Sequence, residues 1–141
     1  MLTCWRIGGT SGIGQSMVSK FAEQGANVII SDLNAPPATP HNSLFIHTDV
    51  TSWSSQVKLF QQTIERFGKI DVVCANAGIS EGENAFEDRT DDAGVPIEPK
   101  WSTIHVNLIG TMATVKLAIH HMKKSGGGRI VLTSSMSGTS P

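Results

Sequence analysis

The sequence of 141 residues lacks an excess of either charge, with 11 Lys and Arg against 12 Asp and Glu. Because nucleic acids and anionic membranes bind clustered positive charge, this balance argues against both as partners. Long apolar runs are also missing, and those present are far shorter than the roughly 20 residues of a membrane-spanning helix. The N-terminus lacks the charged-then-apolar pattern of a signal peptide, so we expect a cytoplasmic location.

Cysteine is scarce as well. Cys4 and Cys74 stand 70 positions apart, with no CxxC pair and no Cys/His spacing around them. This usage argues against a disulfide framework and against a zinc site, so we expect two reduced thiols and no metal.

The composition present is that of one globular domain over residues 1–141, with 39% hydrophobic and 16% charged residues. Short apolar runs alternate with longer helical patterns, which predicts βαβ units around a parallel sheet. The runs are continuous rather than alternating, as expected for strands covered on both faces. The predicted strands are residues 2–7, 28–30, 44–46, 71–74 and 129–132.

Three helices are predicted between these strands, and we expect the apolar stripe of each to face the sheet. Gly25 and Gly68 follow the first two helices, where a C-terminal cap needs a positive φ. Residues 81–99 are acidic and aperiodic, so we expect a surface excursion, a candidate lid on the substrate side. The stripes are Ile13, Met17 and Phe21; Val57, Phe60 and Ile64; and Ile104, Leu108, Met112, Val115 and Ile119.

A glycine-rich turn follows the first strand and runs directly into the first helix. Gly8 allows a tight turn, Gly12 lets the backbone approach a pyrophosphate, and Gly14 permits close contact between helix and strand. The helix N-terminus adds oriented N–H groups and partial positive charge. The segment therefore predicts a dinucleotide cradle, and its cofactor-binding residues are Gly8, Thr10, Ser11, Gly12, Ile13 and Gly14.

Asp32 ends the second strand 18 positions after Gly14. This is close to the separation of about 20 at which a carboxylate meets the adenosine ribose hydroxyls. A simpler interpretation is a strand-end Asp that begins a turn with Asn34. The carboxylate would repel a 2′-phosphate and no Lys or Arg follows nearby, so the sequence favours NAD over NADP.

Four further motifs follow in order along nearly the whole chain. Together with the cradle and Asp32 they resemble the short-chain dehydrogenase/reductase family. The resemblance implies an α/β Rossmann fold, a doubly wound parallel sheet in three αβα layers with strand order 3-2-1-4-5, here incomplete at about five strands. The motifs are Asp49-Val50, Cys74-Ala75-Asn76-Ala77-Gly78, Asn107 within His105-Val106-Asn107-Leu108, and Thr133-Ser134-Ser135.

The resemblance also implies a role for each motif. Asp49 and Val50 would bind the adenine, and the segment Asn76-Ala77-Gly78 would bring its backbone to the cofactor ribose. Asn107 would bend its helix and hold a water, and Ser135 would be the catalytic hydroxyl on the substrate oxygen. Two simpler interpretations stay open: Asp49 as a helix-capping residue, a role compatible with adenine binding, and Asn107 as a satisfied polar helix residue.

The family moves a hydride between the nicotinamide and the carbon of a secondary alcohol or ketone, while a Tyr and a Lys four residues later handle the proton. This sequence contains no tyrosine, and none of its five histidines is placed to substitute. General acid–base help contributes about 10²–10⁴-fold, so we expect an NAD-dependent oxidoreductase by family whose truncated chain is itself inactive.

The family's full-length form would be a homo-oligomer that acts on a small alcohol or ketone. A sheet that stops at the fifth strand would leave Ile130, Val131 and Leu132 as an uncovered apolar edge. The alternative function is a non-catalytic dinucleotide-binding or interaction module, whereas Asn107 and Ser135 at family positions disfavour a methyltransferase-type Rossmann domain.

Overall fold

The computed structural model describes residues 3–10, 12–80 and 84–135. Within them, five parallel strands form one sheet in the order β3-β2-β1-β4-β5, as predicted. The strands agree with the predicted runs to within two residues, and Leu2 lies outside the described part. They are β1 (Thr3–Ile7), β2 (Asn27–Asp32), β3 (Ser43–His47), β4 (Val72–Ala75) and β5 (Arg129–Leu132).

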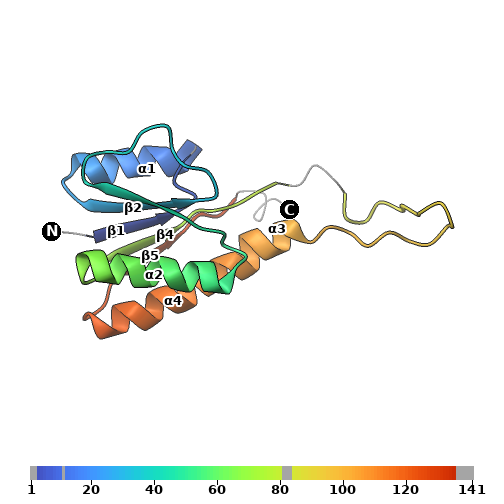
Figure 1. Ribbon diagram of the computed structural model, residues 1–141. Helices are drawn as coiled ribbons and strands as arrows, with labels where there is room; N and C mark the ends of the chain where they lie inside the picture. The colour runs from blue at the N-terminus through green and yellow to red at the C-terminus, as the bar shows by residue number, and fades with distance from the viewer. Residues whose placement is uncertain (1–2, 11, 81–83, 136–141) are drawn as a thin grey trace.

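Helices cover both faces of the sheet and complete the three layers (Figure 1). The helical connection from β1 to β2 runs toward the β3 edge of the sheet, whereas the helical connections from β3 to β4 and from β4 to β5 run toward the β5 edge. Right-handed crossovers that run in opposite directions place their helices on opposite faces. One face carries α1 (Gly12–Glu23). The other carries α2 (Trp53–Phe67) and a continuous helical run made of α3 (Ser102–Ile104), the π-helical segment η1 (His105–Gly110) and α4 (Thr111–Lys124).

Alternate residues of the central strand β2 belong to two separate hydrophobic cores. In β2, Val28 and Ile30 pack with Val18 of α1, while Ile29 between them packs with Leu59 and Phe60 of α2. All three β2 side chains are at most 1% exposed. The continuous apolar runs in the sequence are therefore explained by burial on both faces of the sheet.

The helix ends follow the capping signals in the sequence. Ser52 caps α2, since its Oγ accepts a hydrogen bond from the Ser55 N–H. Gly68 ends α2 with φ 77°, and its N–H donates to the Ile64 carbonyl. Gly25 has φ 76° just after α1. Both predicted glycine C-caps are confirmed.

The predicted face of α4 is wrong. Leu108, Met112 and Ile119 are 54%, 60% and 43% exposed, whereas Leu117 and Met122 are buried against the sheet. The helix is apolar on more than one side, so periodicity alone did not decide which side the sheet covers. The covered side of the helix also carries a buried polar residue, Thr114, and so does not read as an apolar stripe in the sequence.

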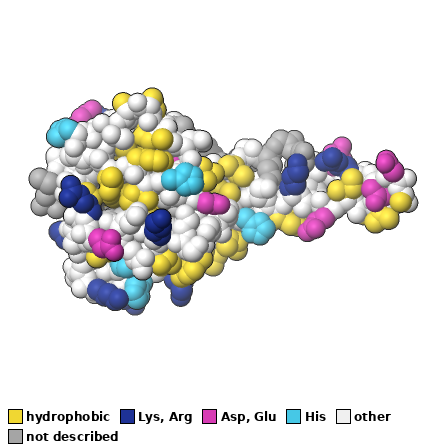
Figure 2. All heavy atoms as spheres, viewed as in Figure 1, with side chains coloured by type: hydrophobic (Ala, Val, Ile, Leu, Met, Phe, Trp, Pro, Cys, Tyr) yellow, Lys and Arg dark blue, Asp and Glu magenta, His cyan; other side chains and the backbone are white. Residues whose placement is uncertain are grey.

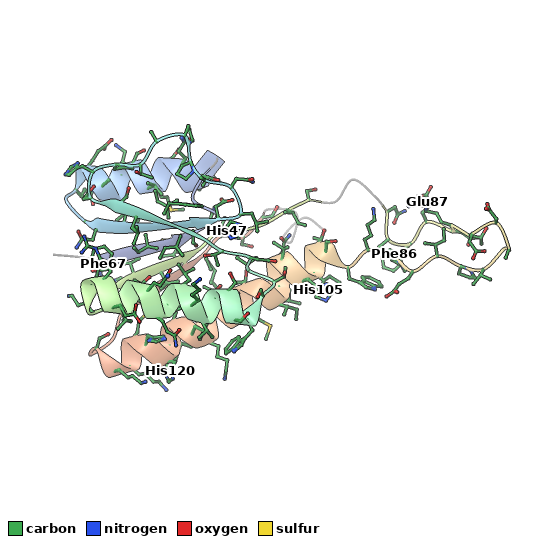
Figure 3. The ribbon with its side chains drawn as sticks, in the orientation of Figure 1. His47, Phe67, Phe86, Glu87, His105 and His120 are labelled. Carbon is green, nitrogen blue, oxygen red and sulfur yellow. The ribbon has the colours of Figure 1, made fainter. Side chains whose placement is uncertain are left out.

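The excursion is described from residue 84 onward and extends away from the sheet as an arm (Figures 1 and 2). An isolated bridge pairs Thr90 with Pro96, and the Asp91 carboxylate accepts the N–H groups of Ala93 and Val95. Figure 3 places Phe86 on this arm, where its side chain is 90% exposed. We define residues 84–100 as the arm.

Candidate functional site

The candidate site lies at the carboxyl ends of the strands, where the strand order reverses beside β1. Open α/β sheets bind their ligands at this topological switch point. A hollow of about 220 Å³ lies there, and its lining joins the segments that follow β1, β2, β3 and β4. Seven predicted site residues line it: Gly8, Asp32, Asp49, Val50, Asn76, Ala77 and Gly78. Sequence reasoning had not singled out the other four, Leu33, Thr48, Ile79 and Val106.

The glycine turn is tightly packed where it meets the sheet and open where it enters α1. Gly8 has φ 72°, and a Cβ there would lie 2.8 Å from the Ala77 Cα. A Cβ on Gly14 would overlap the Gly8 carbonyl oxygen, so close approach of helix and turn requires this glycine. Gly12 has φ 49° with no atom within 4 Å of a built Cβ, which leaves room for a ligand at the helix N-terminus.

Other residues of the turn lie around this hollow rather than in its lining. The Thr10 N–H donates to the Asp32 carboxylate at 3.3 Å, and Ile13 is 62% exposed at the start of α1. Ser11 lies outside the described residues. The first turn of α1 holds no acidic residue, so the partial positive charge of its N-terminus is not neutralised there.

Asp32 connects two of these segments. Its Oδ2 accepts the Thr10 N–H, and its Oδ1 accepts the Asn34 N–H at 3.2 Å. The turn with Asn34 is therefore present, and the same carboxylate lines the hollow. A carboxylate offers about four lone-pair sites, so these two bonds leave capacity for ligand hydroxyls.

Asn76 ties the glycine turn to the fifth strand. Its Nδ2 donates to the Gly8 carbonyl at 3.1 Å, and its Oδ1 accepts from the Thr133 hydroxyl at 2.8 Å. Thr133 stands in the sequence motif with Ser134 and Ser135, but no role was predicted for it. The available signal was a hydroxyl residue directly after β5, where the other strands also present their site residues.

Asp49 holds the turn that precedes α2 and also lines the hollow. Its Oδ1 accepts both the N–H and the hydroxyl of Thr51, at 2.8 and 2.7 Å. Ser52, not Asp49, is the N-cap residue. Within the described part of the chain, no hydrogen bond is seen at Asp49 Oδ2.

Asn107 lies in η1 and holds the segment after β4. Its Nδ2 donates to the Ile79 carbonyl at 2.8 Å, and its Oδ1 accepts the Ile79 N–H at 2.9 Å. The amide is thus satisfied, and Asn107 fixes a lining residue without lining the hollow itself. Ser135 follows β5, is exposed, and is also outside the lining.

The lining is acidic, with two carboxylates and, among the described residues, no Lys, Arg or His. No group of three or more His, Cys, Asp or Glu in the described ranges could hold a metal. The open cradle at Gly12, the helix N-terminus and the Asp32 carboxylate fit a dinucleotide: donors for a pyrophosphate and an acceptor for ribose hydroxyls. No helix of the described chain is long and apolar enough to cross a membrane.

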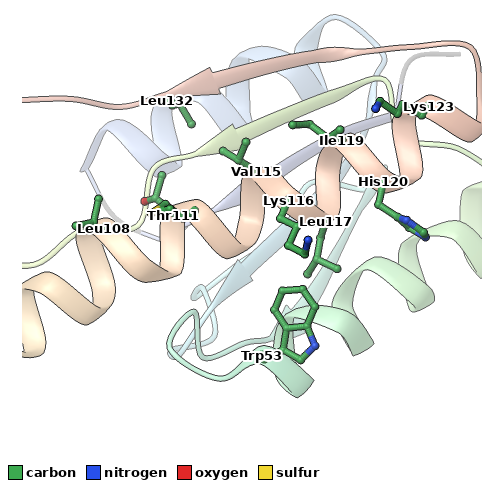
Figure 4. Close-up of a pocket in the computed structure, with 11 residues that line it drawn as sticks. Trp53, Leu108, Thr111, Val115, Lys116, Leu117, Ile119, His120, Lys123 and Leu132 are labelled. Atoms are coloured by element: carbon green, nitrogen blue, oxygen red, sulfur yellow. The ribbon is translucent and has the colours of Figure 1, made fainter.

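A larger hollow of about 940 Å³ runs along α4 (Figure 4). Leu108, Val115 and Ile119 line it from the helical run, with Trp53 from α2 and Leu132 from β5. Its walls are mainly apolar, and the polar side chains that line it all come from α4 and do not converge from several strand ends as those of the smaller hollow do: Thr111, Lys116, His120 and Lys123. The smaller hollow is therefore the better candidate site.

The model of the family described as short chain dehydrogenase matches residues 5–141. The "Short-chain dehydrogenase/reductase prx4" of Penicillium rubens is 42% identical over 137 residues, 95% of this chain and 40% of that protein. A short chain dehydrogenase from Leptospira borgpetersenii with bound NAD+ has a TM-score of 0.84 and 27% identity, over 99% of this chain and 53% of that one. ElxO with NADP bound has a TM-score of 0.81 and 28% identity, over 99% and 58%. This chain therefore spans between 40% and 58% of these three proteins.

Proposed function

Since the chain belongs to the short chain dehydrogenase family, we propose that the hollow between the ends of β1 and β4 binds a nicotinamide dinucleotide. The observation that carries the proposal is the convergence of the glycine turn, Asp32 and the Asn76–Gly78 segment on one site. In this arrangement the N-terminus of α1 holds the pyrophosphate and Asp32 accepts the adenosine ribose hydroxyls. Asp49 and Val50 lie beside the adenine.

NAD is the favoured dinucleotide, because a 2′-phosphate would be placed near the Asp32 carboxylate. The second carboxylate of the lining, that of Asp49, adds to the repulsion. The similar solved structures do not decide the matter, since one holds NAD+ and another NADP.

The reaction proposed for the whole protein is oxidation of a secondary alcohol or reduction of a ketone. When bound, the dinucleotide would supply or accept the hydride. Ser135 would hydrogen-bond the substrate oxygen and stabilise the charge that develops there. Asn107 would hold the Ile79 segment in place and a water beside it.

A second candidate, a dinucleotide-binding module without turnover, is favoured by the absence of tyrosine in the 141 residues. General acid–base help of the kind a Tyr and Lys pair supplies contributes about 10²–10⁴-fold. We therefore expect this chain to bind the dinucleotide and not to turn over alcohols. Dehydrogenase activity that Ser135→Ala abolishes would overturn this second candidate.

Fluorescence titration with NADH and NADPH tests the site. We expect saturable binding of NADH and weaker binding of NADPH. Asp32→Asn should weaken NADH binding and reduce the discrimination against NADPH, because it removes the charge that repels the extra phosphate. Asp92→Asn, an exposed carboxylate on the arm, is the matched control and should change neither. Absence of saturable binding of either dinucleotide, with circular dichroism showing a folded protein, would make the proposal wrong.

A further inference from the structure

Gln56 on α2 is fully buried although its side chain carries an amide. A buried amide without partners destabilises the fold, so such groups are found hydrogen-bonded. Here Nε2 donates to the Val50 carbonyl at 2.6 Å and to the Gly110 carbonyl at 3.1 Å. Oε1 accepts from the Thr114 hydroxyl at 2.9 Å. None of these partners belongs to α2, so the amide links α2 to two other segments.

One carbonyl belongs to a residue that lines the candidate site, and the other to the last residue of the helical segment that carries a second lining residue. Val50 lines the hollow from the loop after β3, and Val106 lines it from η1, which ends at Gly110. Two carbonyl oxygens are both acceptors and cannot bond each other. The Gln56 amide supplies the two N–H groups that hold them together.

The loop after β3 and the end of η1 lie too close together for a side chain at Gly110. A Cβ on Gly110 would lie 3.0 Å from the Val50 oxygen and 3.1 Å from the Val50 Cγ2. The Thr114 hydroxyl lies 2.9 Å from both Gln56 Oε1 and the Gly110 oxygen, and its one hydrogen serves one of them at a time. By donating to Oε1, the Thr114 hydroxyl holds the Gln56 amide with its oxygen toward Thr114. The amide N–H groups then point toward the Val50 and Gly110 carbonyls.

The segment held by this bridge is the π-helical η1. A π-helical turn is rare and is frequently found at functional sites. η1 carries Val106 in the wall of the hollow and Asn107, whose amide fixes the backbone of Ile79. A shift of Gly110 away from Val50 would therefore move one wall of the hollow relative to the other.

We infer that Gln56 is a positioning residue that sets the separation between the Val50 wall and the Val106 wall and thereby the affinity for the dinucleotide. Gln56 does not line the hollow, so its effect is exerted through Val50 and Gly110. The inference rests on the proposed function.

The test compares Gln56→Met and Gln56→Glu by NADH fluorescence titration, at a temperature where circular dichroism shows every variant folded. Met keeps the length of the side chain and loses both donors, so we expect the Kd for NADH to rise about tenfold, the effect of one to two lost hydrogen bonds. An ionised Glu also has no donor. Lowering the pH from 8 to 6 should protonate this buried carboxyl and partly restore the affinity of Gln56→Glu, but not of Gln56→Met.

Two controls separate positioning from stability. Leu59 is fully buried on the same helix and takes no part in the bridge, so Leu59→Ala should lower stability and leave the Kd of the folded protein unchanged. Thr114→Val removes the hydroxyl that orients the amide and should raise the Kd several-fold, whereas Thr114→Ser keeps the hydroxyl and the affinity. If the Gln56 variants do not fold, the comparison of Thr114→Val with Thr114→Ser tests the positioning role instead.

Unchanged NADH affinity in Gln56→Met, or in Thr114→Val where the former does not fold, would overturn the positioning role. Equal weakening of NADH binding in Leu59→Ala would also overturn the positioning role, because loss of stability alone would then explain the higher Kd. If the unsubstituted protein binds neither NADH nor NADPH, the proposed function fails and this inference with it. The two failures are thus distinguishable.

Discussion

Gly14 stands where no side chain fits. A Cβ there would overlap the Gly8 carbonyl, the same oxygen that accepts the Asn76 amide. The turn, the start of α1 and the segment after β4 therefore depend on one small residue.

Gly14→Ala should displace the turn, destabilise the fold by about 1–3 kcal/mol and weaken NADH binding strongly. Gly25→Ala is the matched control, because Gly25 has φ 76° with open space around it and lies at the other end of α1. We expect it to cost about 1–2 kcal/mol through backbone strain and to leave NADH binding unchanged. Urea unfolding and NADH titration measure the two effects. Equal loss of binding in both variants would show that stability, not turn geometry, controls the site.

Part of the predicted site depends on local order along the chain, whereas Asn76 and Asn107 were predicted only from the family resemblance. Gly8, Gly14 and Asp32 follow from short spacings around one turn and one strand end. No role was predicted for Gln56 or Thr133, because their partners Thr114 and Asn76 lie 58 and 57 positions away. Nothing in a local window indicates such a pairing.

At the scale of elements, α4 gives the clearest test of burial, because it presents one methionine to the sheet and one to solvent. Met122 is 5% exposed and Met112 is 60% exposed. Met122→Ala should cost about 2–5 kcal/mol and Met112→Ala less than about 0.5 kcal/mol, measured by urea unfolding. A comparable cost for both would mean that the Met112 side of the helix is also covered.

The central strands β2 and β4 were predictable because both faces of the sheet are covered there, which makes each of them a short apolar run. The face of α4 was not predictable, since both of its sides carry apolar residues. The π-helical turn of η1 also shifts the phase between Ile104 and Met112, and the sequence pattern assumed a uniform helix. Only the contacts of Leu117 and Met122 with the sheet settle the orientation.

At the scale of the whole molecule, one group of exposed apolar side chains follows the helical run and β5. The exposed face of α4 adjoins β5, the edge strand, where Val131 and Leu132 are 45% and 54% exposed. Among the described residues, the expected uncovered edge is present at Val131 and Leu132, whereas Ile130 is partly buried against the core. Figure 4 shows Leu132 and the α4 side chains around the same hollow. An apolar surface of this kind is unusual for a monomeric soluble protein.

This surface should bind an apolar fluorescent dye such as 8-anilinonaphthalene-1-sulfonate without denaturant, since the hollow of about 940 Å³ is open and mainly apolar. Met112→Glu combined with Ile119→Glu places two charges in its wall, which opposes burial of the dye without disturbing the core. We expect dye fluorescence to fall close to that of free dye, while the unfolding midpoint changes little. Phe86→Glu is the control, because Phe86 is as apolar and more exposed but stands on the arm, and it should leave the signal unchanged. A strong signal that survives the double substitution would mean that the dye reports loose packing of the whole domain and not this face.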